Sequence, residues 1–300
     1  MRSCWARPLA WHSKPSSEKN EVSSPVSHIP DGPAVPGCRK EVSSQHRRWQ
    51  VWVAAFAPAK AGAPPMLEGN AILASLPESD ASSIRPHLRP VHLPQKTVLF
   101  EAGTPIKSVY FPITAVISLV IGLEAGSMTE AAMVGRDGAV GIASALDGKI
   151  ALSRGIVQLG GDALVCDSGT FKSVAMQSER LISLVMRHEQ TLFAQAQQST
   201  ACMANHDIEA RLSRWMLRAR DLSGSDDLPF TQDFLAEMLG VQRTSVTTVA
   251  HILQAGGIIR YSRGKIHILD VEALKECACE CYETVEAQYQ QLLGVHYDRP

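Results

Sequence analysis

Residues 231–269 read TQDFLAEMLGVQRTSVTTVAHILQAGGIIRYSRGKIHIL, and the order of helix and strand signals in this stretch decides the fold. Thr231 is a preferred helix N-cap, and Gly240 can adopt the positive φ that ends a helix in a tight turn. A second helix is predicted after this turn, because apolar residues recur at the spacing of one helical face. That face comprises Val246, Val249, Ala250 and Leu253.

Two β-rich runs follow the second helix, which ends at the pair Gly256 and Gly257. The runs are Ile258–Tyr261 and Lys265–Leu269, and a short turn joins them. A helix, a glycine-containing turn, another helix and a β-hairpin in this order predict a winged helix-turn-helix.

The predicted second helix and wing carry positive charge without any negative charge. Residues 241–268 contain Arg243, Arg260, Arg263 and Lys265 but no Asp or Glu. The whole chain has a formal net charge of −1, so an affinity for DNA would have to come from this local patch. An alternative is a helical hairpin packed inside an enzyme, with its outer face merely solvated. The wing and the absence of acids favour DNA binding.

Residues 234–268 resemble the C-terminal DNA-binding domain of the cyclic-AMP receptor protein / FNR (Crp/Fnr) family of bacterial transcription regulators. The resemblance extends back to about Leu76 and is closest from Leu181 onward. It implies an α+β protein with an N-terminal cyclic-nucleotide-binding-like β-roll (a jelly roll), a long dimerisation helix and a C-terminal winged helix-turn-helix. It also implies double-stranded DNA, a second copy of the chain and RNA polymerase as partners.

Composition and the motifs that are missing from the sequence narrow the cellular compartment and the class of protein. The seven cysteines are odd in number and widely scattered, which is typical of a reducing cytoplasm rather than of a secreted disulfide framework. No run approaches the roughly 18 apolar residues of a membrane span. No phosphate loop, nucleophile elbow or zinc-protease motif is present, so we expect no enzyme and no cofactor.

The chain divides into four predicted parts. Residues 1–65 hold nine of the 17 prolines, and we expect a disordered tail or a segment that is not translated, since Met66 resembles a natural start for the family. Residues 66–180 are the predicted β-roll sensor domain, 181–204 the dimerisation helix, and 205–300 the DNA-binding domain.

The β-roll is predicted from short β-rich runs between glycines in residues 94–170. Family members that bind cyclic nucleotide have a Gly-Glu pair and a later Arg that pairs with the phosphate. Here Gly141 is followed by Ile142, and Arg154 is the later arginine. The missing carboxylate argues against cyclic AMP, so we expect an unknown effector, bound if at all near Gly141 and Arg154.

Two helices are predicted between the roll and the helix-turn-helix. The first runs from about Ser183 to Ala204, and its apolar seam suits pairing with a second copy; an ordinary core-packing helix is the alternative. The second is Ile208–Leu222, with its arginines on the solvent face or its edge. These arginines are Arg211, Arg214, Arg218 and Arg220.

A final helix, Val271–Leu292, is predicted after Asp270, and it contains Cys277, Cys279 and Cys281. Alternate residues of one helix point in different directions, which is poor geometry for a tetrahedral metal site. We therefore assign no metal ligands. A metal- or thiol-redox-sensing regulator that uses these three cysteines is the alternative function.

The resemblance implies a homodimer that reads a near-palindromic DNA site. Aligned with the family motif, the positions that read bases are Arg243, Thr244, Ser245 and Thr248. The positions that contact the DNA backbone are Thr231, Gln232, Arg263 and Lys265.

Overall fold

The structure is a computed structural model that describes residues 67–124, 126–148, 150–295 and 297. The expectations for residues 1–65 and for a start at Met66 therefore lie outside the described residues. Among the described helices, none is both long and apolar enough to cross a membrane.

The N-terminal half is a β-roll, as the sequence predicts. Short helical segments precede it: η1 Leu67–Gly69, α1 Ala71–Ala74, α2 Glu78–Ile84 and η2 Arg85–His87. The strands are β1 Arg89–Leu93, β2 Val98–Phe100, β3 Ser108–Pro112, β4 Val116–Gly122, β5 Met128–Val134, β6 Arg154–Leu159 and β7 Gly161–Asp167. A short π-helical segment, η3 Ser144–Gly148, lies between β5 and β6.

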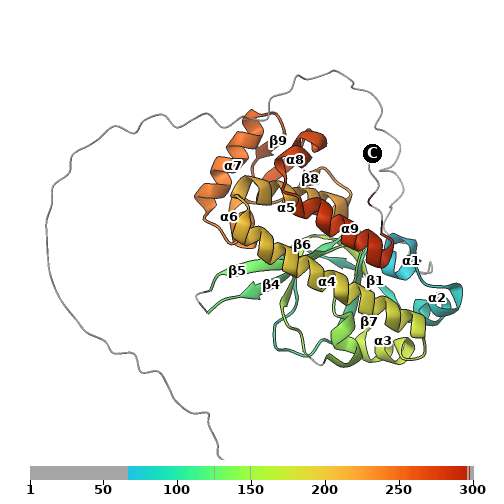
Figure 1. The fold of residues 1–300 in the computed structure, drawn as a ribbon. Helices are drawn as coiled ribbons and strands as arrows, with labels where there is room; N and C mark the ends of the chain where they lie inside the picture. The colour runs from blue at the N-terminus through green and yellow to red at the C-terminus, as the bar shows by residue number, and fades with distance from the viewer. Residues whose placement is uncertain (1–66, 125, 149, 296, 298–300) are drawn as a thin grey trace, which may run out of the picture. The chain divides into compact units, whose positions relative to one another are not determined.

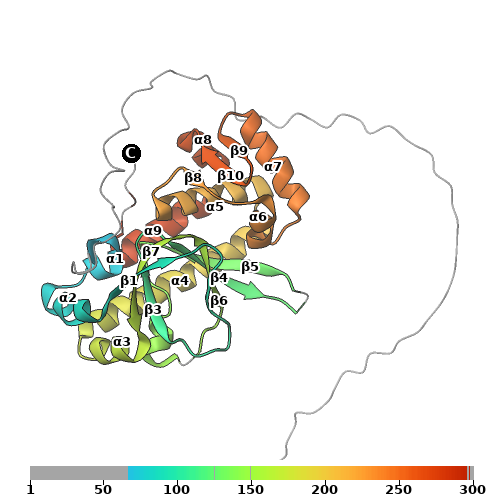
Figure 2. The same ribbon diagram turned by 180° about the vertical axis from the view of Figure 1, so that it is seen from behind.

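Two antiparallel sheets form the roll, with strand orders β1-β7-β3 and β2-β6-β4-β5 (Figure 2). Their alternating apolar residues meet in a core between the sheets, as expected when one face of each strand is buried. This core comprises Leu93, Ala115, Ile117, Val134, Val140, Val157 and Ala163. Strand β1 is an addition to the prediction, since it precedes residues 94–170, where the sequence predicts the strands of the roll.

Helices α3 Ser168–Ala175 and α4 Glu179–Asn205 follow the roll, and α4 lies across it (Figure 1). The predicted seam of α4 faces the protein's own core: Leu181, Leu184 and Val185 are buried. One ring nitrogen of the buried seam residue His188 has a partner there, since His188 Nε2 accepts from the Ala139 N–H at 3.1 Å. The apolar seam of α4 therefore packs against the core of its own chain, and a different face of α4 remains exposed.

The C-terminal half has the predicted winged helix-turn-helix. Its elements are α5 Ile208–Ser223, β8 Asp227–Leu228, α6 Gln232–Leu239, α7 Arg243–Ala255, β9 Ile259–Ser262 and β10 Lys265–Ile268, followed by α8 Val271–Cys277 and α9 Cys281–Leu293 (Figure 1). The prediction of one final helix, Val271–Leu292, is wrong. The helix breaks after Cys277, where Ala278 adopts an extended conformation (φ −82°, ψ 154°).

The prediction that the arginines of α5 lie on its solvent face or edge is wrong for Arg211 and Arg218, because α5 is buried on several sides. Roll residues such as Val120 and Met133 share one apolar core with Leu212, Trp215 and Met216 of α5. A helix enclosed in this way must bury some of its polar side chains. Arg211 and Arg218 are among the buried residues, and Arg211 Nη2 donates to the carbonyl oxygen of Leu239 at the end of α6.

A buried ion pair joins α5 to the roll. Arg218 Nη2 lies 2.5 Å from Asp137 Oδ2, in the turn after β5, and both side chains are almost fully buried. The Tyr297 hydroxyl donates to the same carboxylate oxygen at 2.5 Å, and the Arg218 guanidinium lies 4.4 Å from the Tyr289 ring centroid. Burial opposes the charge on Arg218, but Asp137 and the tyrosines outweigh it and hold the pKa of Arg218 well above its ordinary value.

A second polar contact spans the same joint. Glu130 of β5 accepts from Trp215 Nε1 of α5 at 2.9 Å and from the Ser118 hydroxyl at 2.5 Å. Burial raises the pKa of Glu130 from 4.5 to about 7, although these hydrogen bonds and Arg214 act in the opposite direction. The joint between the roll and α5 therefore contains a carboxyl group that titrates near neutral pH.

We expect Arg218→Met to lower the free energy of unfolding by about 3–5 kcal/mol, because Asp137 would stay buried without its cation. Urea unfolding measures the loss. The matched control is Arg85→Met at the exposed Arg85–Glu78 pair, where a loss below about 1 kcal/mol is expected. Adding Asp137→Leu to Arg218→Met should recover part of the loss. Equal costs for the Arg218 and Arg85 substitutions would contradict the assignment.

We expect Glu130→Gln to change how stability depends on pH. The folded-state pKa of about 7 exceeds the ordinary 4.5, so the folded state binds more protons between these values and Glu130 lowers stability as pH rises through that window. The difference between wild type and Glu130→Gln should therefore change by on the order of 3 kcal/mol across it. Unfolding measured at a series of pH values tests this, with Glu78→Gln as the control on an exposed side chain. A difference that does not vary with pH would contradict it.

Candidate nucleic-acid interface

Helix α6 is the first helix of the helix-turn-helix, and its two ends are fixed by the predicted residues. Thr231 Oγ1 accepts from the Phe234 N–H at 3.2 Å and caps the helix. Gly240 ends it with φ 64°, in the left-handed region that favours glycine. A Cβ on Gly240 would lie 3.0 Å from Thr129 Oγ1 of β5, so the turn also lies against the roll.

Helix α7 is the second helix, and it is held by its buried stripe. Val246, Val249, Ala250 and Leu253 are all buried, as their spacing predicts. The Thr247 hydroxyl donates to Gln232 Oε1 at 2.6 Å and links α7 to the start of α6. These contacts leave the opposite face of α7 exposed to solvent.

The wing is a hairpin of β9 and β10 with a two-residue loop. Ser262 pairs with Lys265, and the intervening Arg263 and Gly264 both have positive φ, at 50° and 76°. Positive φ at both positions is the type I′ geometry that matches the twist of the two strands. The loop therefore projects Arg263 and Lys265, both exposed, from the tip of the wing.

The predicted base-reading residues lie together at the N-terminal end of α7. Arg243 is its first residue, with 64% of its side chain exposed; Thr244 and Thr248 are exposed and Ser245 is half-buried. Arg243 Nη1 lies 3.4 Å from Asp233 Oδ1 of α6. Of the predicted backbone contacts, Thr231 is exposed and Gln232 half-buried, both at the start of α6.

The predicted effector residues have structural partners. Arg154 of β6 forms an ion pair with Glu101, with Nη2 2.9 Å from Oε1, so its guanidinium already has a carboxylate partner. Gly141 has φ 90°, and a Cβ there would lie 3.0 Å from Ile106 Cγ2. Close packing and backbone conformation thus account for this glycine.

The three C-terminal cysteines do not share one helix. Cys277 is the last residue of α8, whereas Cys279 and Cys281 lie at the break before α9. The break places the latter two beside Cys202 and His206 at the end of α4, more than 70 residues earlier in the chain. The single final helix predicted from the sequence could not form this set of four, because it would keep Cys279 and Cys281 on different sides of one continuous helix.

Comparisons with known proteins agree with this architecture. The family model of the Crp-like helix-turn-helix domain matches residues 210–277. A comparison of the sequence with curated proteins gave no match.

Solved structures of similar fold include FixK2 from Bradyrhizobium japonicum, with a TM-score of 0.55, 12% identity and coverage of 64% of this chain and 98% of that one. A CRP-family transcriptional regulator from Thermus thermophilus has a TM-score of 0.53, 17% identity and coverage of 69% and 98%. A CRP/FNR-family regulator from the same organism has a TM-score of 0.52, 22% identity and coverage of 63% and 98%. The resemblance found in the sequence is confirmed: the chain carries a Crp-like helix-turn-helix domain and has the Crp/Fnr regulator fold.

Proposed function

We propose that this protein is a sequence-specific DNA-binding transcription regulator of the Crp/Fnr type, which acts as a homodimer on a near-palindromic site. The observation that carries the proposal is the exposed surface of α7 and the wing. It presents Arg243, Arg260, Arg263 and Lys265 without one acidic residue between Val241 and Ile268. Cationic and hydroxyl side chains on the face opposite a buried stripe are what a major-groove helix needs.

The N-terminal end of α7 is the base-reading end in this proposal. The residues that reach base edges from a recognition helix lie near its N-terminus, where Arg243, Thr244, Ser245 and Thr248 stand. Arginine can donate two hydrogen bonds to guanine, and hydroxyls can serve several bases. We therefore assign the strongest base preference to Arg243.

The ion pair of Arg243 with Asp233 does not prevent this role. Both side chains are mostly exposed, and an exposed pair contributes at most about 1 kcal/mol. A good bidentate contact with guanine contributes about 1–3 kcal/mol of discrimination. The DNA contact is therefore the stronger of the two, and Asp233 holds the guanidinium near α6 until DNA displaces it.

In this proposal, residues on either side of α7 contact the DNA backbone. Thr231 and Gln232 lie at the start of α6, and Arg263 and Lys265 lie at the wing tip. Contacts of this kind fix the register of a protein on DNA and carry no sequence information.

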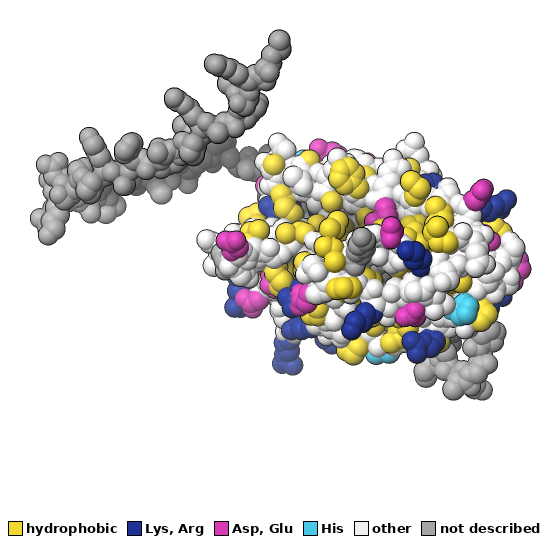
Figure 3. Space-filling model, turned by 90° about the horizontal axis from the view of Figure 1, so that it is seen from below, with side chains coloured by type: hydrophobic (Ala, Val, Ile, Leu, Met, Phe, Trp, Pro, Cys, Tyr) yellow, Lys and Arg dark blue, Asp and Glu magenta, His cyan; other side chains and the backbone are white. Residues whose placement is uncertain are grey.

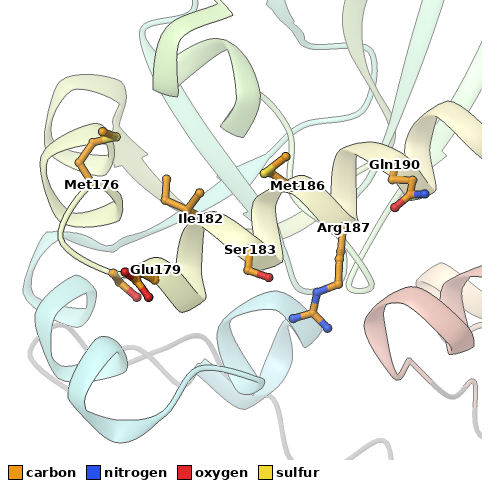
Figure 4. Close-up of a pocket in the computed structure, with 8 residues that line it drawn as sticks. Met176, Glu179, Ile182, Ser183, Met186, Arg187 and Gln190 are labelled. Atoms are coloured by element: carbon orange, nitrogen blue, oxygen red, sulfur yellow. The ribbon is translucent and has the colours of Figure 1, made fainter.

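We assign the dimer interface to the face of α4 that the roll of the same chain leaves uncovered. Met186 and Phe193, two helical turns apart, are 69% and 65% exposed. Met176, Ile182, Met186 and Arg187 line a groove along this helix, and Figure 4 shows Met186 and Arg187 pointing to opposite sides of α4. The face seen from below has hydrophobic side chains gathered toward its middle (Figure 3). Exposed apolar stripes of this kind mark association surfaces.

The effector remains unassigned in this proposal, and cyclic AMP is not favoured. The arginine that would pair with a cyclic phosphate, Arg154, has its carboxylate partner in Glu101. A ligand bound near Gly141 and Arg154 would first have to break that ion pair.

We expect Arg243→Ala to weaken binding to the specific site by about 1–3 kcal/mol while leaving binding to scrambled DNA nearly unchanged. Fluorescence anisotropy of the full chain on its own promoter DNA and on scrambled DNA measures both affinities. Lys265→Ala is the matched comparison. It should weaken binding to both DNAs alike and lower the slope of log K against log salt by about 1. Equal losses on both DNAs for Arg243→Ala would contradict its base-reading role.

We expect Phe193→Glu to shift the protein from dimer to monomer, because it places a charge in an apolar interface. Sedimentation velocity at several concentrations measures the change. Leu152→Glu, at a side chain 87% exposed and away from α4, is the control and should leave the dimer intact. A monomeric wild-type protein would contradict the homodimer.

A further inference from the structure

Four metal-ligating side chains from two distant parts of the chain meet at one point. Cys202 lies in the last turn of α4 and His206 directly follows that helix, while Cys279 and Cys281 lie at the break between α8 and α9. One ligand atom from each residue can be chosen so that all four lie within 4.8 Å of one another. Three of the four residues are buried.

Two of the six distances between the four ligand atoms match a tetrahedral ion, and all six are at most 4.8 Å. Bonds of about 2.3 Å from zinc to sulfur and about 2.0 Å to nitrogen imply sulfur–sulfur separations of about 3.8 Å and sulfur–nitrogen separations of about 3.5 Å. The Sγ atoms of Cys202 and Cys279 are 3.5 Å apart, and Cys281 Sγ is 3.5 Å from His206 Nδ1. The side chains thus already stand near the spacing of a bound ion.

The orientation of His206 supports this reading. Its Nε2 lies 3.2 Å from Glu280 Oε1, which favours the tautomer with the proton on Nε2. The other ring nitrogen, Nδ1, then presents its lone pair toward Cys281. A carboxylate behind a histidine in this way is the usual outer support of a metal-bound imidazole.

A second outer contact acts on a sulfur. Gln198 Nε2 donates to Cys281 Sγ at 3.0 Å, from one turn before Cys202 on α4. The cationic side chains of Arg211 and Arg214 are also close enough to act electrostatically on Cys202. Three thiolates and a divalent cation carry one net negative charge, which these groups can offset.

The simpler reading is a small core of thiols, which pack against Ala210 like other buried cysteines. In that reading a thiol–imidazole hydrogen bond joins Cys281 to His206, and a thiol–thiol hydrogen bond joins Cys202 to Cys279. Neither bond requires ligand atoms of all four residues to lie within 4.8 Å of one another. The donor set therefore favours a ligand over a purely apolar cluster.

We propose that Cys202, His206, Cys279 and Cys281 form a tetrahedral site for one Zn²⁺ ion. Three thiolates and one imidazole are a set that selects zinc among the common divalent ions, and four protein ligands leave no position open for catalysis. The role is therefore structural or regulatory. The ion ties the joint between α4 and α5 to the α8–α9 break, and so holds the DNA-binding domain at the point where it leaves the long helix.

The test uses the full chain. Zinc is quantified in protein purified without added metal, and the metal-free protein is titrated with Co²⁺, whose absorption reports tetrahedral thiolate coordination. We expect one zinc per chain and the cobalt bands of a tetrahedral site with three sulfurs. Because these readings come from the wild-type chain, they stand even if a cysteine variant fails to fold.

Variants then assign the ligands. Cys279→Ser and His206→Ala should abolish or shift the cobalt spectrum, whereas the matched control Cys277→Ser should leave it unchanged. Glu280→Gln keeps all four ligands and should weaken metal affinity about 10- to 100-fold.

Three results would overturn the proposal. One is a full chain without zinc and without tetrahedral cobalt bands. Another is iron with inorganic sulfide in place of zinc, which would make the cysteines ligands of a cluster. The third is an equal loss of cobalt binding in Cys277→Ser and Cys279→Ser.

Discussion

The buried ion pair between Arg218 and Asp137 joins three separate parts of the described structure. Taking an arginine and a carboxylate out of water costs least free energy when they meet each other and their other hydrogen-bonding groups find partners. Tyr297 supplies one such partner, and the Tyr289 ring supplies a face for the guanidinium. The turn after β5, helix α5 and the C-terminal residues must therefore come together in one arrangement.

This arrangement makes the roll and the DNA-binding domain share one apolar core. Helix α5 is enclosed on several sides, and Glu130 of the roll contacts Trp215 across the same joint. A change at the joint would move α5, against which the recognition helix packs. The proposed zinc site lies at the opposite end of α5, so the position of this helix would be set from both ends.

The sequence predicts what depends on local rules. The Thr231 cap, the left-handed Gly240 and the buried stripe of α7 follow from spacing and residue type, and the structure has all three. The roll strands follow from β-rich runs between glycines. The exposure of Arg243 follows from its place opposite the buried stripe.

What the sequence did not show depends on contacts between distant segments. An amphipathic pattern cannot show that a second domain covers the polar edge of α5, so the sequence predicts Arg218 on the solvent face or its edge. The break after Cys277 has no proline or glycine to mark it, so the sequence predicts one continuous helix across it. Only that break brings Cys279 and Cys281 to Cys202 and His206. The sequence shows the apolar seam of α4, but it does not show that this seam packs against the protein's own roll.

The most direct test of the central claim is the selection of bound duplexes from a random DNA library by the full-length protein. The selection should enrich two inverted half-sites whose centres lie about 34 Å, or one helical turn, apart. This spacing is expected because each protomer of the proposed dimer would place one α7 in a major groove. A library that shows no enriched sequence after repeated rounds would contradict it, as would a single half-site bound by one protomer.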